Sequence, residues 1–265
     1  MVQDNQALPT RLEVDTNLVQ AHGVLTALMA ADLYWWLVTL DKPCRWVPYQ
    51  RWALMFCVST DTIKRQQSKL AGLFVVERTR RKNAAGRAVL GANCYSLHQW
   101  RKDQMKRNRK AQTTGSNDAG ATADLVVFPL EYIQLAIKYG NNSSPAGFAW
   151  FLYRVSRLLF LNRHRKSASA VTTFKSMDWL AHYCQLPKRT LERYTEQARR
   201  TGAVVIVGNH IAAPGVAEAE LLAPLLRIEQ ERETALFNLL ADDSTAKPYL
   251  QDWADDMLYQ LKRSS

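Results

Sequence analysis

The sequence predicts a mainly α-helical fold with small β wings, an α+β chain of two tandem domains of one kind followed by C-terminal helices. Three observations predict it. An apolar helical pattern of the same form occurs twice, once from Trp52 and again from Leu180. Runs rich in β-branched residues follow each copy and indicate short strands. The chain ends in two stretches whose leucines recur at helical spacing among charges.

The repeated pattern spans residues 52–65 and 180–193, which align without a gap. In each copy an alanine lets two helices cross closely, a branched apolar residue fills the turn, and a further apolar residue anchors the second helix. This order predicts a helix-turn-helix. The aligned pairs are Ala53 with Ala181, Val58 with Leu186, Thr62 with Thr190, Ile63 with Leu191, and Arg65 with Arg193.

Polar residues remain on the outer face of the second helix of each copy, and they suit base edges and phosphates in a DNA major groove. For either copy alone, a helical hairpin with a solvated face is the alternative. The recurrence of the pattern favours double-stranded DNA as the partner. The candidate DNA-binding residues are Thr60, Asp61, Thr62, Lys64 and Arg65 in the first copy, and Lys188, Arg189, Thr190 and Arg193, beside Glu192, in the second.

The same elements flank both copies in the same order. Apolar segments and a long apolar helix come before each copy, and strands come after it. Helices followed by a β-hairpin resemble the winged helix-turn-helix superfamily over residues 10–100 and 124–212. The resemblance implies two tandem winged helix-turn-helix domains. The flanking segments are 12–14, 24–40, 74–78 and 91–97 for the first copy, and 125–127, 146–161 and 203–207 for the second.

The two predicted hairpins differ in charge. Arginine and lysine surround the turn of the first, as suits a loop that follows a phosphate backbone or enters a minor groove. A solvated charged hairpin is the alternative. The second is reduced to the tight turn Gly208-Asn209, so that copy is expected to depend more on its helix. The candidate DNA-binding residues of the first hairpin are Arg78, Arg80, Arg81, Lys82 and Arg87.

Charge is distributed unevenly along the chain. The net charge of +11 favours a polyanionic partner. Residues 213–265 contain ten acidic and five basic residues, a net charge of −5, which leaves +16 on the rest. We therefore expect four parts: a first winged-helix domain (1–100), a basic flexible linker (101–123), a second winged-helix domain (124–212) and an acidic helical segment (213–265).

The acidic segment is predicted to form two amphipathic helices, at 219–240 and 249–261. Their acidic faces should avoid DNA, so we expect them to pack against the second domain, with self-association as the alternative. The apolar residues of the first helix are Leu222, Leu225, Leu226, Ile228, Leu236 and Leu239, and those of the second are Leu250, Trp253, Met257, Leu258 and Leu261.

Tryptophans and cysteines are expected in the core. Helical spacing and apolar neighbours favour packing over base stacking for the tryptophans. The cysteines show no paired spacing and are expected to be buried free thiols of a reducing compartment. The residues concerned are Trp35, Trp36, Trp46, Trp52, Trp150 and Trp179, and Cys44, Cys57, Cys94 and Cys184.

No pattern in the chain predicts an enzyme. Phosphate-binding glycine loops, nucleophile elbows and clustered carboxylates are not found, and the histidines have no metal-ligand spacing, so no catalytic residue, cofactor or metal is expected. No segment is apolar for long enough to predict a membrane span. We expect a cytoplasmic protein associated with the nucleoid or a plasmid.

The tandem order of the two domains resembles that of plasmid and phage replication initiators, which implies binding to repeated origin sites. A transcriptional regulator or a partition-type centromere-binding protein of a mobile element is the alternative within DNA binding. A winged-helix protein-interaction module is the alternative of another class, and the basic first hairpin argues against it.

Overall fold

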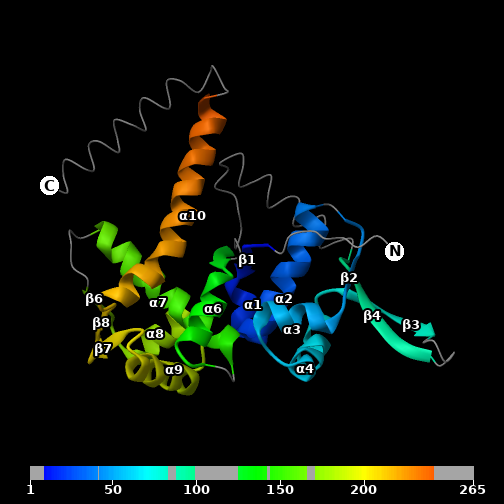
Figure 1. Ribbon diagram of the computed structural model, residues 1–265, viewed down its shortest axis with the longest axis horizontal. Coiled ribbons are helices and arrows are strands. Elements are labelled where there is room, and N and C mark those ends of the chain that lie inside the picture. Colours follow the sequence, from blue (N-terminus) through cyan, green and yellow to red (C-terminus); the bar gives the residue numbers. More distant parts are fainter. Residues whose placement is uncertain are drawn as a thin grey trace. The chain divides into compact units, whose positions relative to one another are not determined.

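The computed structural model describes residues 9–40, 42–82, 88–98, 125–141, 144–165 and 171–241. These residues are mostly helical and carry small antiparallel sheets, which confirms the predicted α+β class (Figure 1). The chain divides into two compact units. Residues 1–150 with 185–187 form the first unit, and residues 151–184 with 188–265 form the second.

The first unit is organised around a buried helix, α2. Its residues from Val24 to Leu33 are all buried except Leu25, and Leu28, Met29 and Leu33 have no exposed surface. The elements of this unit are β1 (Arg11–Asp15), α1 (Thr16–His22), α2 (Val24–Tyr34), the π-helical turn η1 (Trp35–Thr39), β2 (Arg45–Val47), α3 (Tyr49–Phe56), α4 (Thr60–Leu70), β3 (Val75–Lys82), β4 (Ala88–Ser96), β5 (Leu125–Pro129) and α6 (Glu131–Lys138).

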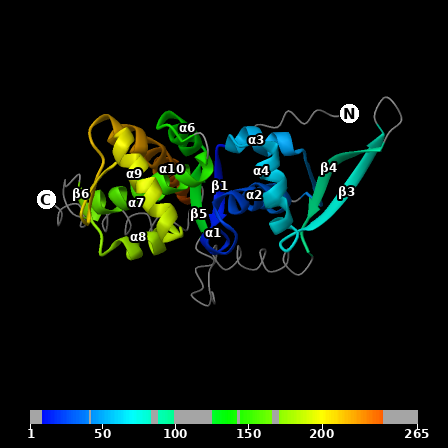
Figure 2. The same cartoon turned by 90° about the horizontal axis from the view of Figure 1, so that it is seen from below.

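Strands β1 and β5 form a two-stranded antiparallel sheet (Figure 2). Val14 pairs with Val126 and Leu12 pairs with Phe128, and these four side chains are buried on one face. The two segments were expected to precede separate domains as similar elements. In the structure they pair directly with each other, because alternate apolar residues in both strands provide one face that can be buried.

The second sheet of the first unit has the order β2-β4-β3, with antiparallel pairing throughout. Strands β3 and β4 form a long hairpin that extends beyond the helices of this unit (Figure 1). Both strands are longer than predicted, and the pairing shifts register between Arg78 and Arg80. Strand β2 was not predicted, because so short a strand cannot show an alternating pattern.

The second unit repeats this strand order with shorter strands. Its sheet has the order β6-β8-β7, again antiparallel, so the strand before the helix pair lies next to the last strand of the hairpin in both units. Its elements are α7 (Pro145–Arg165), whose first turns belong to the first unit, β6 (Val171–Thr173), α8 (Met177–Cys184), α9 (Lys188–Thr201), β7 (Val205–Val207), β8 (His210–Ala212) and α10 (Val216–Ala241).

The tryptophan prediction is confirmed for Trp36, Trp52 and Trp150, which are fully buried, and is wrong for Trp46, which is 46% exposed. Trp46 is the middle residue of β2, and its neighbour Val47 is buried. Successive side chains of a strand point to opposite faces, so burial of Val47 turns Trp46 outward. Trp35 and Trp179 are half-buried.

The cysteine prediction is confirmed in part. All four cysteines are free thiols, but only Cys94 and Cys184 are buried, whereas Cys44 and Cys57 are half-buried. Cys44 lies in the connection before β2, and Cys57 lies in the turn after α3. Both positions are in connections between elements, which run over the protein surface.

Helix α10 confirms the first predicted C-terminal helix and corrects its buried face. Leu221, Leu222 and Leu225 are buried, whereas Leu226 is 49% exposed. At about 100° per residue, Leu221, Leu222 and Leu225 share one arc of the helix surface, and Leu226 lies beyond the edge of that arc. Ile228 is half-buried, and residues 229–235 are all exposed. The side chains of Leu236 and Leu239 and the predicted helix at 249–261 lie outside the described residues.

Within the described ranges, no helix has the length and apolar character that crossing a membrane requires.

Candidate nucleic-acid interface

The helix pairs α3–α4 and α8–α9 turn in the same way. Helix α3 ends at Cys57, whose φ is 51°, and the chain adopts the same left-handed conformation at Gln185, whose φ is 55°. In the described chain these are the only residues other than glycine with positive φ. Cys57 and Gln185 occupy equivalent positions in the two copies of the sequence repeat. The repeat therefore extends to an uncommon backbone conformation.

The anchor residues of the second helices lie where the repeat predicts. Ile63 on α4 and Leu191 on α9 are fully buried. The expected turn residues Val58 and Leu186 are only half-buried. The rotation of α4 and α9 about their axes is set by these anchors together with the other buried residues of each helix, which leaves the opposite faces of both helices in solvent. The other buried residues are Gln67 and Leu70 on α4, and Tyr194 and Ala198 on α9.

Serine or proline precedes each of these four helices. Ser59 caps α4 by accepting a hydrogen bond from the backbone N–H of Thr62 at 3.2 Å, and Ser176 accepts one from Trp179 N at 3.1 Å before α8. Pro48 precedes α3 and Pro187 precedes α9. Both residue types favour a helix start, serine by accepting from an unpaired N–H and proline through its fixed φ.

The exposed face of α4 holds Asp61, Lys64 and Arg65. Lys64 Nζ donates to Asp61 Oδ1 at 2.9 Å, and this hydrogen bond lowers the pKa of the Asp61 carboxyl. Arg65 forms no ion pair with any described residue. Thr60 and Thr62 are half-buried, and Thr62 Oγ1 lies 2.9 Å from the hydroxyl of Ser59, so it belongs to the helix cap.

The exposed face of α9 holds Lys188, Arg189 and Arg193, and Thr190 beside them is half-buried. Lys188 Nζ lies 2.9 Å from Oδ1 of Asp178 on α8, and this hydrogen bond raises the pKa of the lysine. The guanidinium of Arg193 lies 5.1 Å from the ring centre of Tyr194.

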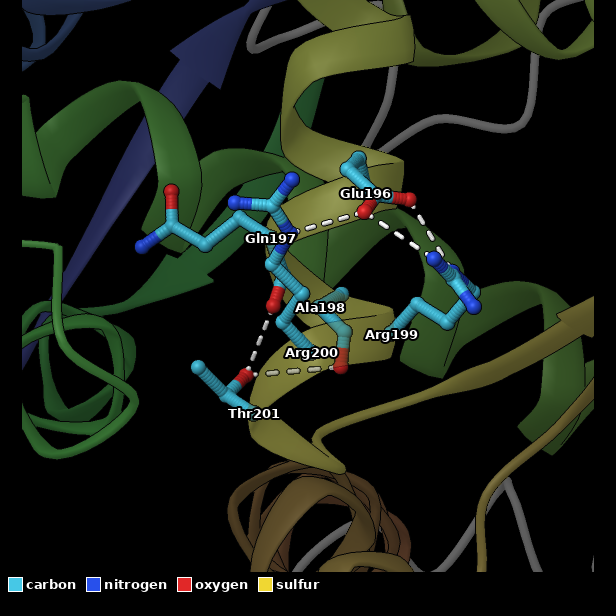
Figure 3. Close-up of polar contacts among 6 residues, drawn as sticks. All are labelled: Glu196, Gln197, Ala198, Arg199, Arg200 and Thr201. Carbon is cyan, nitrogen blue, oxygen red and sulfur yellow. Dashed lines mark hydrogen bonds and ion pairs between the residues drawn. The ribbon is translucent and has the colours of Figure 1, made fainter.

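In the last turns of α9, Arg199 and Arg200 form ion pairs with Glu196 (Figure 3). The two arginines are expected from the sequence as part of a basic helix, but their pairing with Glu196 was not predicted. Glu196 accepts hydrogen bonds from Arg199, at 2.9 and 3.0 Å, and from Arg200, at 2.7 Å. The bonds from Arg199 and then Arg200 lower the pKa of Glu196 to about 2. The spacing of three and four positions on one helix is the signal that could have revealed these pairs.

The basic residues of the first hairpin are placed by their backbone register. Arg78 pairs with Asn93, Arg80 with Leu90, Arg81 with Val89 and Lys82 with Ala88. Arg87 was also predicted to bind DNA, and it lies outside the described residues.

Hydrogen bonds between side chains connect this hairpin to α4. Asn93 Nδ2 on β4 donates to the hydroxyl of Tyr49 on α3 at 2.9 Å, and that hydroxyl donates to Oε1 of Gln67 on α4 at 2.5 Å. Asn93 and Gln67 are both buried. Buried polar groups that are mutually satisfied fix relative geometry, so α4 and β4 are held at a set distance by Tyr49.

A buried carboxyl group fixes α3 against α2. Asp32 on α2 has no exposed surface and accepts hydrogen bonds from Trp52 Nε1 at 2.9 Å and from Arg51 at 3.5 Å. Burial raises the pKa of Asp32, and the positive charge of Arg51 opposes that rise. The position of the first helix pair thus depends on an ionisable group inside the core.

In the second unit, an arginine performs the corresponding task. Arg154 on α7 donates from Nε, at 3.1 Å, and from its terminal nitrogen to the backbone carbonyl of Tyr183, near the end of α8. Its guanidinium also lies 4.3 Å from the ring centre of Tyr183, whose ring stacks in parallel on that of Trp179. Arg154 therefore satisfies a carbonyl that the helix end leaves without a partner.

No group of metal-binding side chains occurs among the described residues. The chain matches no protein-family model, no curated protein and no solved structure at a significant level.

Proposed function

We propose that this chain is a sequence-specific double-stranded DNA-binding protein with two winged helix-turn-helix domains. Helices α4 and α9 are its recognition helices. The hairpin β3–β4 is the wing of the first domain, and the short hairpin β7–β8 is the wing of the second.

One observation carries the proposal: the two units share a helix pair with the same turn and a three-stranded sheet of the same order, in which the strand before the pair lies next to the last strand of the hairpin after it. A single helical hairpin with a polar face needs no ligand. Two such pairs whose sequences align without a gap, each with an exposed arginine at the equivalent position of its second helix, support a shared function. The net charge of +11 supports a polyanion as the binding partner.

The recognition helices act by entering the major groove with their exposed faces. Arg65 and Arg193 are long enough to reach base edges, and a guanidinium offers two parallel donors to guanine. Lys64 and Lys188 each form an ion pair with a carboxylate at 2.9 Å. On DNA they exchange this carboxylate for a phosphate oxygen. The first wing adds phosphate or minor-groove contacts through its basic residues.

The biological role that we propose is replication initiation at repeated origin sites, from the resemblance in tandem domain order. A regulator or a centromere-binding protein would bind its site without supporting replication. A plasmid-maintenance assay separates these roles. In a host that does not encode this chain, a plasmid whose origin fragment carries the selected site should replicate only when the chain is supplied.

DNA binding itself is tested by selection of bound duplexes from a random library, followed by titration of the best sequence. The double variant Lys64→Ala/Arg65→Ala should weaken specific binding by about tenfold or more, because a good base contact contributes about 1–3 kcal/mol, and it should leave thermal unfolding unchanged. The matched control Lys138→Ala/Arg232→Ala removes the same charge from α6 and α10 and should bind as the parent does.

If no duplex is enriched, or if both double variants bind equally well, the proposal is wrong and the helix pairs serve another task.

A further inference from the structure

The side chains of α4 and α9 can be compared position by position. The left-handed residues Cys57 and Gln185 and the buried anchors Ile63 and Leu191 all correspond in the alignment of the sequence repeat. The turn sets where each helix begins, and the anchor sets how it is rotated. A residue on α4 and its aligned residue on α9 therefore point in the same direction relative to the turn and the buried anchor of their own helix pair.

One exposed position is the same in both helices. Arg65 and Arg193 correspond, and both are exposed. Neither forms an ion pair with a carboxylate in the described part of the chain. Arg193 lies beside the ring of Tyr194, but both arginines are exposed, so a ligand can reach them. Thr62 and Thr190 also correspond, but Thr62 takes part in the cap of α4. The shared position that can read a base is thus the arginine.

Two other exposed positions carry opposite charges. Asp61 corresponds to Arg189, and Lys64 corresponds to Glu192. All four side chains are exposed. On α4 the pair is closed by the 2.9 Å hydrogen bond between Lys64 and Asp61. The order of these charges along the helix is therefore reversed between the two recognition helices, although the turn and the buried anchor are equivalent in both.

We propose that the DNA target consists of two unequal half-sites, which share a guanine at the position read by Arg65 and Arg193 and differ at the position read by Asp61 and Arg189. This inference rests on the proposed function. Arginine donates two hydrogen bonds to guanine O6 and N7, whereas a carboxylate accepts one from cytosine N4. The first half-site therefore takes cytosine where the second takes guanine.

The experiment is selection from a random duplex library with the full chain and its variants. Arg65→Ala should lose the guanine preference in one half-site only, and Arg193→Ala should lose it in the other, each by about 5- to 150-fold, which corresponds to about 1–3 kcal/mol. Arg65→Lys and Arg193→Lys retain the charge without the planar fork. They should therefore lose the guanine preference and keep most of the affinity for phosphates.

The charge order can also be exchanged on the surface. Asp61→Arg/Lys64→Glu gives the first helix the charges of the second at these two positions, and the two selected half-sites should then become alike at the bases that these positions read. Arg189→Asp/Glu192→Lys makes the opposite exchange and should also produce two like half-sites, of the other kind. Unchanged thermal unfolding confirms that each variant is folded.

Three results overturn the inference. If a site is selected but Arg65→Ala and Arg193→Ala do not both lose a preference for guanine, the prediction of a shared guanine is wrong while the proposed function stands. If the exchanged variants retain unequal half-sites, the role of the charge order is wrong. If no duplex is selected at all, the proposed function fails and this inference fails with it.

Discussion

Trp52 on α3 donates its indole N–H to the carboxyl group of Asp32 on α2, with 2.9 Å between Nε1 and Oδ2, and neither side chain has exposed surface. The same carboxyl group receives Arg51, whose side chain is 16% exposed. Removing it would leave a buried donor and a mostly buried cation without an acceptor.

The Asp32→Ala variant should therefore lose about 3 kcal/mol of the free energy of unfolding, in the range seen when one partner of a buried ion pair is removed. Asp32→Asn keeps an acceptor for Trp52 and should lose less. Urea denaturation followed by tryptophan fluorescence measures both. Equal losses in the two variants would show that the charge, and not the acceptor, is what α3 requires.

The raised pKa of Asp32 predicts how stability depends on pH. Burial favours the neutral carboxyl, so the folded state binds this proton more tightly than the unfolded state, whose ordinary pKa is 3.8. The stabilisation is fully present below 3.8 and is lost as pH rises through the folded-state pKa. The stability of the parent minus that of Asp32→Asn should fall over this window and stay constant above it. A difference that rises with pH would contradict the direction of the shift.

The left-handed residues in the two turns predict a pair of equivalent effects. A β-branched side chain is strongly disfavoured at positive φ, so Cys57→Val and Gln185→Val should each destabilise the protein by about 1 kcal/mol or more. Asparagine tolerates this conformation, so Cys57→Asn and Gln185→Asn are the matched controls. Thermal unfolding should separate each valine variant from its asparagine control, and no separation would mean that the turns relax.

Tyr49 joins the first hairpin to α4, and its hydroxyl can be removed alone. Tyr49→Phe leaves the buried side chains of Asn93 and Gln67 without their shared partner, at a cost of about 1–3 kcal/mol. Hydrogen exchange should also become faster for β4 amides next to Asn93. Exchange that changes equally in every strand would indicate general destabilisation and would refute a specific link.

Glu196 holds two arginines that DNA would otherwise attract. Glu196→Gln should increase non-specific DNA affinity and steepen its salt dependence by about 0.9 in slope for each new phosphate contact. Because the pKa of Glu196 is lowered to about 2, the parent's salt dependence should be insensitive to this group between pH 5 and 8. A slope that does not change in the variant would place Arg199 and Arg200 away from the phosphates.

The repeated helix pairs could be predicted from sequence because their signal is local: the alanine, the turn residue and the anchor lie close together in each copy. The long helix expected at 24–40 changes at Tyr34 into the π-helical turn η1, whose apolar residues show no pattern that separates them from an α-helix. Strands β2 and β6 are too short to show a period. The pairing of β1 with β5 depends on tertiary contact. The similarity of the two segments alone suggested that each begins its own domain.

The candidate site was predictable to a similar extent. The exposed positions of α4 and α9 follow from helical period once Ile63 and Leu191 are buried. The partners of these residues did not follow as readily. Asp178 reaches Lys188 from another helix, and Asn93 on β4 reaches Tyr49 on α3, so both contacts exist only after the units have folded.

The β1–β5 sheet has a consequence for biosynthesis. Asp15 pairs with Leu125, so most of the first unit's sequence is translated between the two strands. At about 5–20 residues per second, β1 leaves the ribosome on the order of 10 seconds before its partner exists. During that interval the backbone N–H and C=O groups along the edge of β1 have no partner strand. Translation speed between these strands therefore governs how long the nascent chain presents an open edge to other molecules.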